Sequence, residues 1–462
     1  MSSSASTFSL PPVNAAPVST DARLRYVLRH FALAYEEVAE GLIGYAGSQQ
    51  PIEVADAADG FFEHQRPCPA APNYREWAGQ MVPFFFDAQP PAPLLELIPG
   101  RVRINADLIS AAFYLLSGWQ EYFSDARDRH GRFPYAASVQ QRFGFAALPV
   151  VNYYFDVLRA AVEHVTGRPL RPRRWAGGAP FAAFISHDID TLRSAWKAAA
   201  KAALQRGHLL RFGHLLWQHL TRPDAWDNLE AVAAAVAEYG ARSTFFILPE
   251  HRPGADGTPN ADYELLGPLC QRLEKLHKKG HEVAFHGSIG TATDAKHRER
   301  ERDNMQNRLR GVPYAAGLRF HYLRWDPRLT LDALQRASAA YDSTLGFAEH
   351  YGFRNSYCHP FYPFSFARGE ASDLLEIPLN VMDATLHHPN YLQLRAEEML
   401  PALLPMLAEI EKFGGVATIL WHNNHFDPAN TVTGPRQFAE IMGYLQQHGA
   451  AFLTGSQIVA DI

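Results

Sequence analysis

The stretch Phe181-Ala182-Ala183-Phe184-Ile185-Ser186-His187-Asp188-Ile189-Asp190 passes from an apolar run directly into two carboxylates. Residues 181–186 have the length and composition of a buried strand. In an extended chain, residues two apart point to the same side, so Asp188 and Asp190 are expected to face one pocket. A simple turn is the alternative interpretation, because Asp is common where a strand passes into a loop. The stretch predicts a strand whose end carries chemistry.

Three later apolar runs also end in polar side chains. They precede His286-Gly287-Ser288, Arg319-Phe320-His321-Tyr322-Leu323-Arg324 and Leu420-Trp421-His422-Asn423-Asn424. Taken singly, each histidine is as typical of a hydrogen-bonded core residue, and the arginine of a surface ion pair. Together, acids, imidazoles and a guanidinium at strand carboxyl ends are how an α/β barrel forms a catalytic mouth. The pattern therefore predicts a hydrolytic enzyme.

Strand-like and helical patterns alternate through the second half of the chain. The strand candidates are residues 181–186, 243–248, 282–285, 317–320, 340–343, 374–377 and 416–421. Helical patterns between them cover residues 229–239, 264–279, 296–310 and 397–412. Repeated βα units predict a parallel sheet, and seven of them predict an α/β fold of the deformed (β/α)7 barrel type.

The chain before this region has a different organisation. Residues 1–20 are rich in Ser, Pro and Ala and are expected to be disordered. Residues 21–170 mix helical patterns with short strand-like runs, which predicts a smaller α+β domain. Pro and Gly punctuate residues 171–180, which we interpret as a linker to a barrel domain at 181–462.

Composition narrows the class of protein. A net charge of -5 over 462 residues gives no global attraction to nucleic acid, and no nucleic-acid-binding motif is present. Cys68, Cys270 and Cys358 are far apart, which is typical of reduced thiols in the cytoplasm. The first residues lack signal-peptide features, and no apolar run has transmembrane length. We expect a cytoplasmic protein, with its oligomeric state left open.

In their order along the chain, these motifs resemble the polysaccharide deacetylase family, the NodB-homology domain of family 4 carbohydrate esterases. The resemblance covers residues 181–462. It implies a (β/α)7 barrel that removes N- or O-acetyl groups from sugars, usually with a divalent metal such as zinc. By resemblance, Asp188 is the base that activates water, and Asp190 and His286 are metal ligands. Arg319 corresponds to the arginine that orients the base, and His422 to the acid that protonates the leaving nitrogen.

Further motifs are similar to those of a bacterial subgroup in which an uncharacterised α+β domain precedes the barrel. These motifs include Asp342-Ser343-Thr344-Leu345-Gly346-Phe347 and Glu376-Ile377-Pro378-Leu379. Residues beside the catalytic motifs are candidates for substrate binding. They are His187, His321, Tyr322, Arg324, Trp421 and Asn423.

The chain departs from the family at one metal-binding position. The family has a second histidine four residues after the first, whereas this chain has Gly290, which offers no side-chain ligand. Asp190 and His286 alone are fewer than the three protein ligands usual for a catalytic zinc. The candidates for a third ligand are Asp294, His297, His187 and His321, none at the family's spacing.

Three functions follow from these observations. The first is hydrolysis of a carbon–nitrogen bond other than a peptide bond, with N-deacetylation of a sugar or glycan precursor as the specific activity. The second is metal-independent hydrolysis of a cyclic imide or ureide on the same barrel, which the loss of the second histidine favours. The third is a catalytically silent carbohydrate-binding protein. Asp188, Arg319 and His422 together argue against the third, because binding needs neither a base nor an acid.

An insertion at residues 193–222 has a composition of its own. It contains six basic residues and no acidic residue, and leucines and tryptophans alternate with the charges. This pattern predicts one or two basic amphipathic helices. They would contact an anionic surface at the inner face of a membrane or a lipid-linked glycan. The alternative is a helical hairpin that packs over the barrel or against the N-terminal domain.

Overall fold

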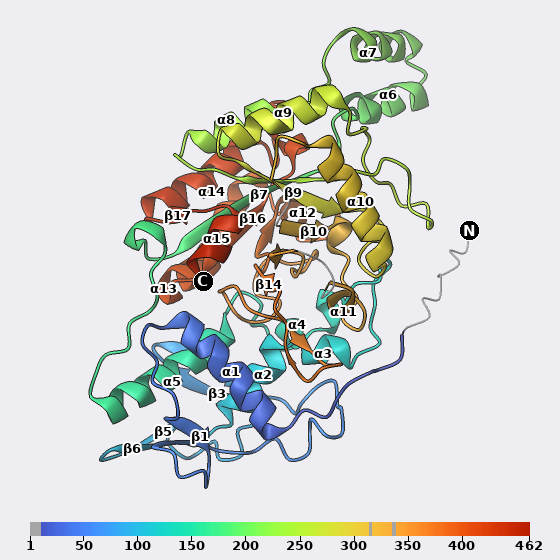
Figure 1. The fold of residues 1–462 in the computed structure, drawn as a ribbon. Helices are drawn as coiled ribbons and strands as arrows, with labels where there is room; N and C mark the ends of the chain where they lie inside the picture. The colour runs from blue at the N-terminus through green and yellow to red at the C-terminus, as the bar shows by residue number, and fades with distance from the viewer. Residues whose placement is uncertain (1–10, 314–316, 335–338) are drawn as a thin grey trace.

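The computed structural model describes residues 11–313, 317–334 and 339–462. Figure 1 shows residues 11–170, called the early part of the chain, at the bottom of the view. A curled sheet with surrounding helices lies above them. The predicted disorder of residues 1–10 lies outside the described residues. Residues 11–19 form hydrogen bonds with later segments: the backbone carbonyls of Pro11 and Asn14 accept from Arg328 and Tyr122.

The main sheet has nine strands, and all of their pairings are parallel. Its order is β14-β11-β10-β9-β8-β7-β16-β15, with β17 also pairing with β7. The strands are β7 (Ala182–Ile189), β8 (Thr244–Ile247), β9 (Glu282–Gly287), β10 (Gly317–Phe320), β11 (Tyr341–Asp342), β14 (Leu375–Glu376), β15 (Val381–Met382), β16 (Val416–Leu420) and β17 (Ala451–Phe452).

The structure confirms the α/β class and a curled, barrel-like parallel sheet. Each of the seven predicted strands is present, but the count was wrong, because the short strands β15 and β17 also join the sheet. Both have only two residues, and neither was among the predicted strands. In the described chain, β14 and β15 end the sheet without pairing with each other, so backbone hydrogen bonds do not close the barrel.

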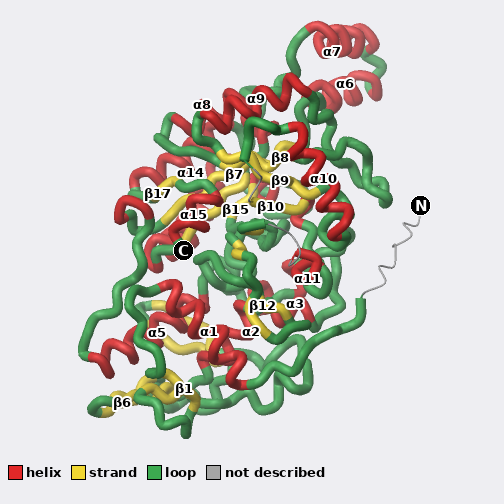
Figure 2. The backbone as a smooth tube through the Cα atoms, viewed as in Figure 1, coloured by secondary structure: helices red, strands yellow, loops and turns green. Residues whose placement is uncertain are grey.

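Helices follow most of the strands and lie around the outside of the sheet, whereas α6 and α7 project away from it (Figure 2). They are α6 (Ala195–Gln205), α7 (Leu209–Thr221), α8 (Leu229–Ala237), α9 (Gly267–Lys278), α10 (Ala295–Arg308), α11 (Thr330–Leu334), α12 (Asp383–His387), α13 (Met399–Phe413), α14 (Pro435–Gln447) and α15 (Gly455–Asp461). A small antiparallel pair, β12 (Phe364–Ser365) and β13 (Glu370–Ala371), lies between β11 and β14 in the chain. Among the described residues, no helix combines the length and apolar character needed to cross a bilayer.

The early part of the chain contains both helices and strands. A four-stranded sheet has the order β1-β2-β6-β5, and β3 and β4 form a separate antiparallel pair. The strands are β1 (Ile43–Tyr45), β2 (Ile52–Val54), β3 (Asn73–Trp77), β4 (Gln80–Phe84), β5 (Leu95–Ile98) and β6 (Arg101–Ile104). The helices are α1 (Thr20–Ala34), α2 (Leu108–Leu116), α3 (Trp119–Tyr122), α4 (Val139–Arg142) and α5 (Val150–Thr166).

The early part and the barrel share one continuous apolar core. Phe113 of α2 packs edge-on against Phe364 of β12, with ring centroids 4.9 Å apart. A buried ion pair joins Glu121 of α3 to Arg354, which lies between β11 and β12. We infer that the two parts stabilise each other, because removing either would expose the apolar surface of the other.

Candidate active site

A cavity of about 330 Å³ opens where the carboxyl ends of β7, β10 and β16 meet. Asp188, Asp190, His321, Tyr322 and His422 line it. Side chains after parallel strands gather here because all the strands point their carboxyl ends to the same edge. The structure thus brings Asp188 and His422, which are far apart in the sequence, to the same cavity.

Asp188 is held by a buried guanidinium. Nη1 of Arg319 lies 2.9 Å from the Asp188 carboxylate and 2.9 Å from Ser186 Oγ. The other nitrogens of Arg319 donate to the carbonyl and hydroxyl oxygens of Ser343, so the guanidinium is fixed on several sides. Such a charge-assisted contact fixes the direction in which the carboxylate points. Asp188 therefore has the geometry of an oriented base.

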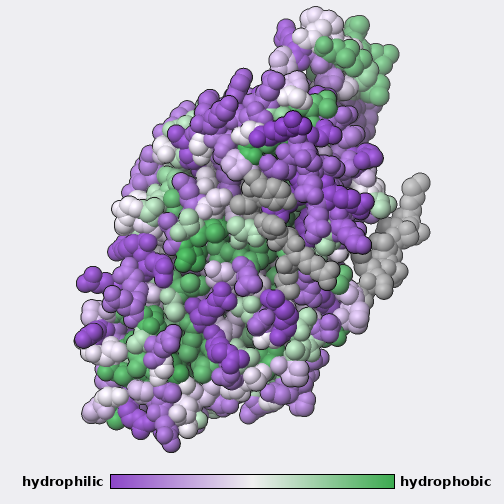
Figure 3. Space-filling view, viewed as in Figure 1, coloured by the Kyte–Doolittle hydropathy of each residue, from purple (hydrophilic) through white to green (hydrophobic). Residues whose placement is uncertain are grey.

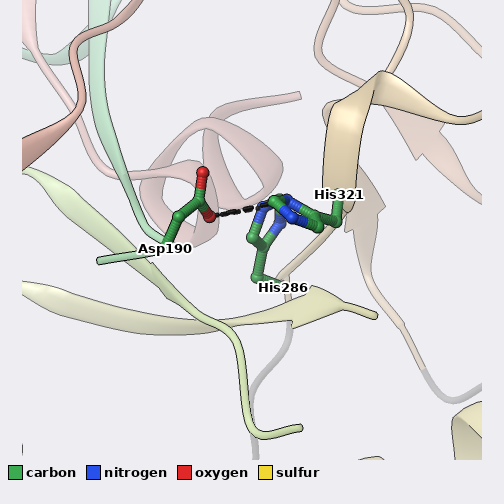
Figure 4. Close-up of side chains that lie close together, drawn as sticks. All are labelled: Asp190, His286 and His321. Atoms are coloured by element: carbon green, nitrogen blue, oxygen red, sulfur yellow. Dashed lines mark ion pairs between the residues drawn. The ribbon is translucent and has the colours of Figure 1, made fainter. Parts of the chain in front are cut away.

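Asp190, His286 and His321 point toward one another (Figure 4), and Asp190 and His321 line the cavity. Asp190 Oδ1 lies 3.4 Å from His286 Nε2 and 3.5 Å from His321 Nδ1. One ligand atom from each residue lies within 4.8 Å of the other two. The residues come from the end of β7, from β9 and from the turn after β10. An aspartate and two histidines are a three-ligand set of the kind that binds a catalytic divalent metal.

The hydrogen bonds of the two histidines fit a metal. His286 Nδ1 lies 2.8 Å from the carbonyl oxygen of Arg319, and His321 Nε2 lies 3.2 Å from that of Pro259. A carbonyl oxygen only accepts, so each of these nitrogens must carry the proton. The other ring nitrogen of each histidine faces Asp190 Oδ1, and in a neutral ring it would offer a lone pair to a metal there. A cation would satisfy all three atoms.

Burial and neighbouring charges shift the pKa values of this group in different directions. Burial opposes ionisation of Asp190, but the imidazoles of His321, His286 and His422 lower the pKa of its carboxyl below its usual range. Burial lowers the pKa of His321 to about 4, despite the nearby Asp190. His321 is therefore neutral at pH 7, as a metal-ligating imidazole must be.

Gly290, at the position where the family has its second histidine, adopts a backbone φ of +97°. A side chain there would be strained, so the chain is not shaped for a ligand at this position. Two of the other candidates for the third ligand have structural contacts: Asp294 caps α10, and His297 lies 3.0 Å from Glu301. His321 is the one that joins Asp190 and His286.

His422 faces the cavity and is held by a carboxylate that the sequence analysis missed. Its Nδ1 donates to Asp383 at 2.9 Å, and its Nε2 lies 3.6 Å from Asp190 Oδ2. Burial favours the neutral imidazole, but Asp383 and then Asp190 outweigh it and raise the pKa of His422 to about 10. His422 is therefore protonated and suited to donate a proton to a leaving group. Asp383 follows the apolar pair Val381-Met382, which is the same strand-end signal as in the other motifs.

The turn that carries His321 is strained and is supported by the early part of the chain. Tyr322 and Leu323 have φ values of +59° and +53°, which side-chain-bearing residues rarely adopt. Arg132 Nη1 donates to the backbone carbonyl of Tyr322 at 2.8 Å, and the ring of His130 stacks on that of Tyr322. Strained backbone of this kind is often found at functional sites. Composition alone did not reveal that residues 129–132 would form one wall of the cavity.

Four of the residues proposed for substrate binding lie away from this cavity. His187 is one position from Asp188 on β7, so it points to the opposite side of the sheet and packs against Phe245 and Phe438. Trp421 is buried and donates to the Thr433 carbonyl, and Asn423 donates to the carbonyls of Thr191 and Trp226. Arg324 pairs with Asp256 beside a neighbouring cavity. His321 and Tyr322 do line the cavity.

The two motifs shared with the bacterial subgroup meet in the core. Asp342 of β11 and Glu376 of β14 are register partners and are fully buried. Burial raises the pKa of both carboxyl groups, and the neighbouring Asp342 raises that of Glu376 further. The Glu376 carboxyl accepts from the Leu345 N–H at 2.8 Å, and Asp342 accepts from Thr344. This pair orders the turn after β11 and makes no contact with the cavity.

Comparison with known protein families gives one match. Residues 17–167 match a family of unknown function, DUF7033. A comparison with curated proteins gives no significant match.

Comparison with solved structures finds similar folds over about three fifths of the chain. A protein from Mycobacterium smegmatis assigned as a polysaccharide deacetylase is 18% identical, with 63% of this chain and 93% of that chain covered and a TM-score of 0.40. Puue allantoinase is 12% identical over 63% of this chain and 93% of its own, with a TM-score of 0.41. A protein from Pseudomonas aeruginosa PAO1, assigned as a polysaccharide deacetylase, is 14% identical over 62% and 92%, with a TM-score of 0.39.

Proposed function

We propose that this protein hydrolyses a carbon–nitrogen bond other than a peptide bond, and that its substrate is an N-acetylated sugar or glycan precursor. One observation carries the proposal. A carboxylate fixed by a buried arginine and a protonated histidine fixed by a buried aspartate face one cavity beside a three-donor cation site. A base, an acid and a cation site are the three components that metal-assisted amide hydrolysis requires.

The residues divide the reaction between them. Asp188 accepts a proton from the attacking water, and Arg319 keeps its carboxylate oriented during the transfer. His422 donates a proton to the departing amine, and Asp383 stabilises the imidazolium before that step. Asp190, His286 and His321 would hold a divalent cation, which supplies polarisation of the carbonyl and acidification of water. The silent-binding alternative loses support, because binding does not require an oriented base opposite an acid.

The size of the cavity bears on the substrate. About 330 Å³ is at the lower end of ligand pockets, and residues 129–132 wall one side. This size favours a small molecule or the terminal unit of a chain over the middle of a polymer. It also keeps a second candidate open, the hydrolysis of a small cyclic imide or ureide.

The first experiment is calorimetric titration of Zn²⁺, Co²⁺ and Ni²⁺ into chelator-stripped protein. We expect one stoichiometric site that is lost in Asp190→Ala, His286→Ala and His321→Ala. His297→Ala is the matched control, because this histidine lies nearby but pairs with Glu301, and it should bind normally. Absence of binding in the native protein would remove the metal from the proposal.

Turnover tests the chemistry itself. The metal-loaded protein is assayed for amine release from N-acetylated monosaccharides and oligosaccharides and for ring opening of cyclic ureides. Asp188→Asn should keep the metal and lower kcat by about 10³-fold or more, because amide nitrogen cannot accept the proton. Ring opening without deacetylation would favour the second candidate. Full activity in Asp188→Asn would contradict the assignment of the base.

A further inference from the structure

The helical hairpin α6–α7 projects from the body of the molecule, at the top of Figure 1. It forms the connection between β7 and α8, and the two helices pack mainly against each other. No residue of α7 is buried, and in α6 only Ala200 and Ala203 are. A hairpin that packed over the barrel would bury one side of both helices, and these helices do not have such a buried side.

One face of α7 is apolar and open to solvent. Leu209, Leu210, Trp217 and Leu220 are 67%, 94%, 54% and 74% exposed. At about 100° per residue, these four side chains fall within an arc of about 100° on the helix. His219 lies on the opposite flank of α7 and faces α6, where its ring stacks on that of Trp196. The apolar atoms gather at α7 in Figure 3.

Within residues 193–222, the charged side chains are all basic. Between residues 193 and 222 there are six basic residues, Arg193, Lys197, Lys201, Arg206, Arg211 and Arg222, and no acidic residue. The whole chain carries a net charge of -5, so this positive charge is local to the hairpin. Exposed Leu and Trp flanked by Lys and Arg are the composition of helices that lie in the headgroup region of a membrane.

We propose that the α6–α7 hairpin docks this protein on an anionic phospholipid surface. Charge complementarity selects this occupant, because lipid headgroups supply the negative charge and acyl chains receive the leucines and Trp217. A helix of 13 residues is too short to cross a bilayer, so α7 would lie along the interface. The proposal does not depend on the proposed catalytic activity.

The base of the hairpin is close to the cavity along the chain. The segment between Asp190 and α6 is short, and Thr191 lines the cavity. Asp262 accepts from the N–H groups of Leu192 and Arg193 and from the Ser194 hydroxyl, which fixes the base of the hairpin.

Vesicle co-sedimentation of the full chain tests the proposal. We expect binding to vesicles of phosphatidylcholine with phosphatidylglycerol and little binding to phosphatidylcholine alone. Leu210→Ser/Trp217→Ser should weaken binding by about 10-fold or more, since it removes most of the exposed apolar area. Lys197→Gln/Lys201→Gln/Arg211→Gln should weaken it by about 100-fold, which corresponds to about fivefold for each of the three charges.

The matched control is Tyr74→Ser/Leu97→Ser, which removes two exposed apolar side chains from the early part of the chain and should bind like the native protein. Absence of binding to either vesicle, or equal binding by the native and hairpin variants, would overturn the proposal. So would a native dimer that dissociates in Leu210→Ser/Trp217→Ser without lipid binding, because the face would then be an interface between copies. Because sedimentation needs no turnover, failure here is distinguishable from failure of the proposed hydrolysis.

Discussion

At the scale of single residues, each of the two proposed catalytic side chains depends on a second residue. Asp188 depends on Arg319, and His422 depends on Asp383. Asp188 and His422 face the cavity, whereas their partners Arg319 and Asp383 are fully buried. A buried partner is already held in one rotamer by its surroundings, so it orients the side chain that faces the cavity.

Asp383→Asn tests the second pair. The substitution keeps the shape but removes the negative charge that holds His422 protonated, so less imidazolium is available to protonate the amine. We expect kcat to fall by about 10²-fold with KM nearly unchanged, measured on the best substrate from the screen. Retention of kcat within about threefold, in protein with native circular dichroism, would show that Asp383 is structural only.

At the scale of elements, strand alternation sorts side chains between the cavity and the core. On β7, Ser186 and Asp188 contact Arg319, whereas His187 packs on Phe245. The same rule places Asp342 and Glu376 opposite each other across the β11–β14 pair. Both carboxyl groups are buried, and their raised pKa values mean that the pair retains a proton in the folded state.

Glu376→Gln tests this pair by its dependence on pH. The folded pKa of Glu376 is raised, so the folded protein binds more protons than the unfolded chain above the ordinary value of 4.5, and stability falls as pH rises from there. Glutamine removes this penalty and keeps an oxygen for the Leu345 N–H. We expect Tm at pH 8 to rise by roughly 2 °C, with the gain absent at pH 4.

The control for this measurement is Glu63→Gln at an exposed position, which should leave Tm unchanged at both pH values. A lower Tm for Glu376→Gln at both pH values would mean that the carboxyl group is needed for its geometry rather than tolerated as a neutral acid.

At the scale of the whole molecule, the early part of the chain completes the site. Arg132 supports the strained turn at Tyr322, and the shared core runs across both parts. The Glu121–Arg354 ion pair lies on this boundary, with side chains 5% and 1% exposed. We therefore expect one cooperative unfolding transition rather than two.

Glu121→Ala tests this coupling. Arg354 would be left as an unpaired buried cation, so the free energy of unfolding should fall by about 3–5 kcal/mol in denaturant titration. Glu121→Met/Arg354→Met removes both charges and should recover most of the loss. A loss of less than about 1 kcal/mol in the free energy of unfolding for Glu121→Ala, or two separate transitions, would contradict this coupling between the early part of the chain and the barrel.

The sequence could indicate part of the site and not the rest. Apolar runs ending in Asp188, His286, Arg319 and His422 are local signals, and each of them leads to the same region. That His187 faces away from the cavity could have been predicted, since adjacent residues of a strand face opposite sides. Asp383 was missed because the apolar pair before it, Val381-Met382, is shorter than the apolar runs before the other motifs. His321 remained one of four candidates because spacing carries no information about a turn with positive φ.

By itself, the sequence determined the α/β class, the positions of the main strands and the motifs at their ends, because these depend on periodicity and local composition. Only the tertiary structure decided the third donor, the carboxylate behind His422, the wall formed by residues 129–132 and the exposure of the α6–α7 hairpin. The reason is physical. These features depend on which distant segments meet, and that is set by the packing of the whole chain rather than by any one stretch of it.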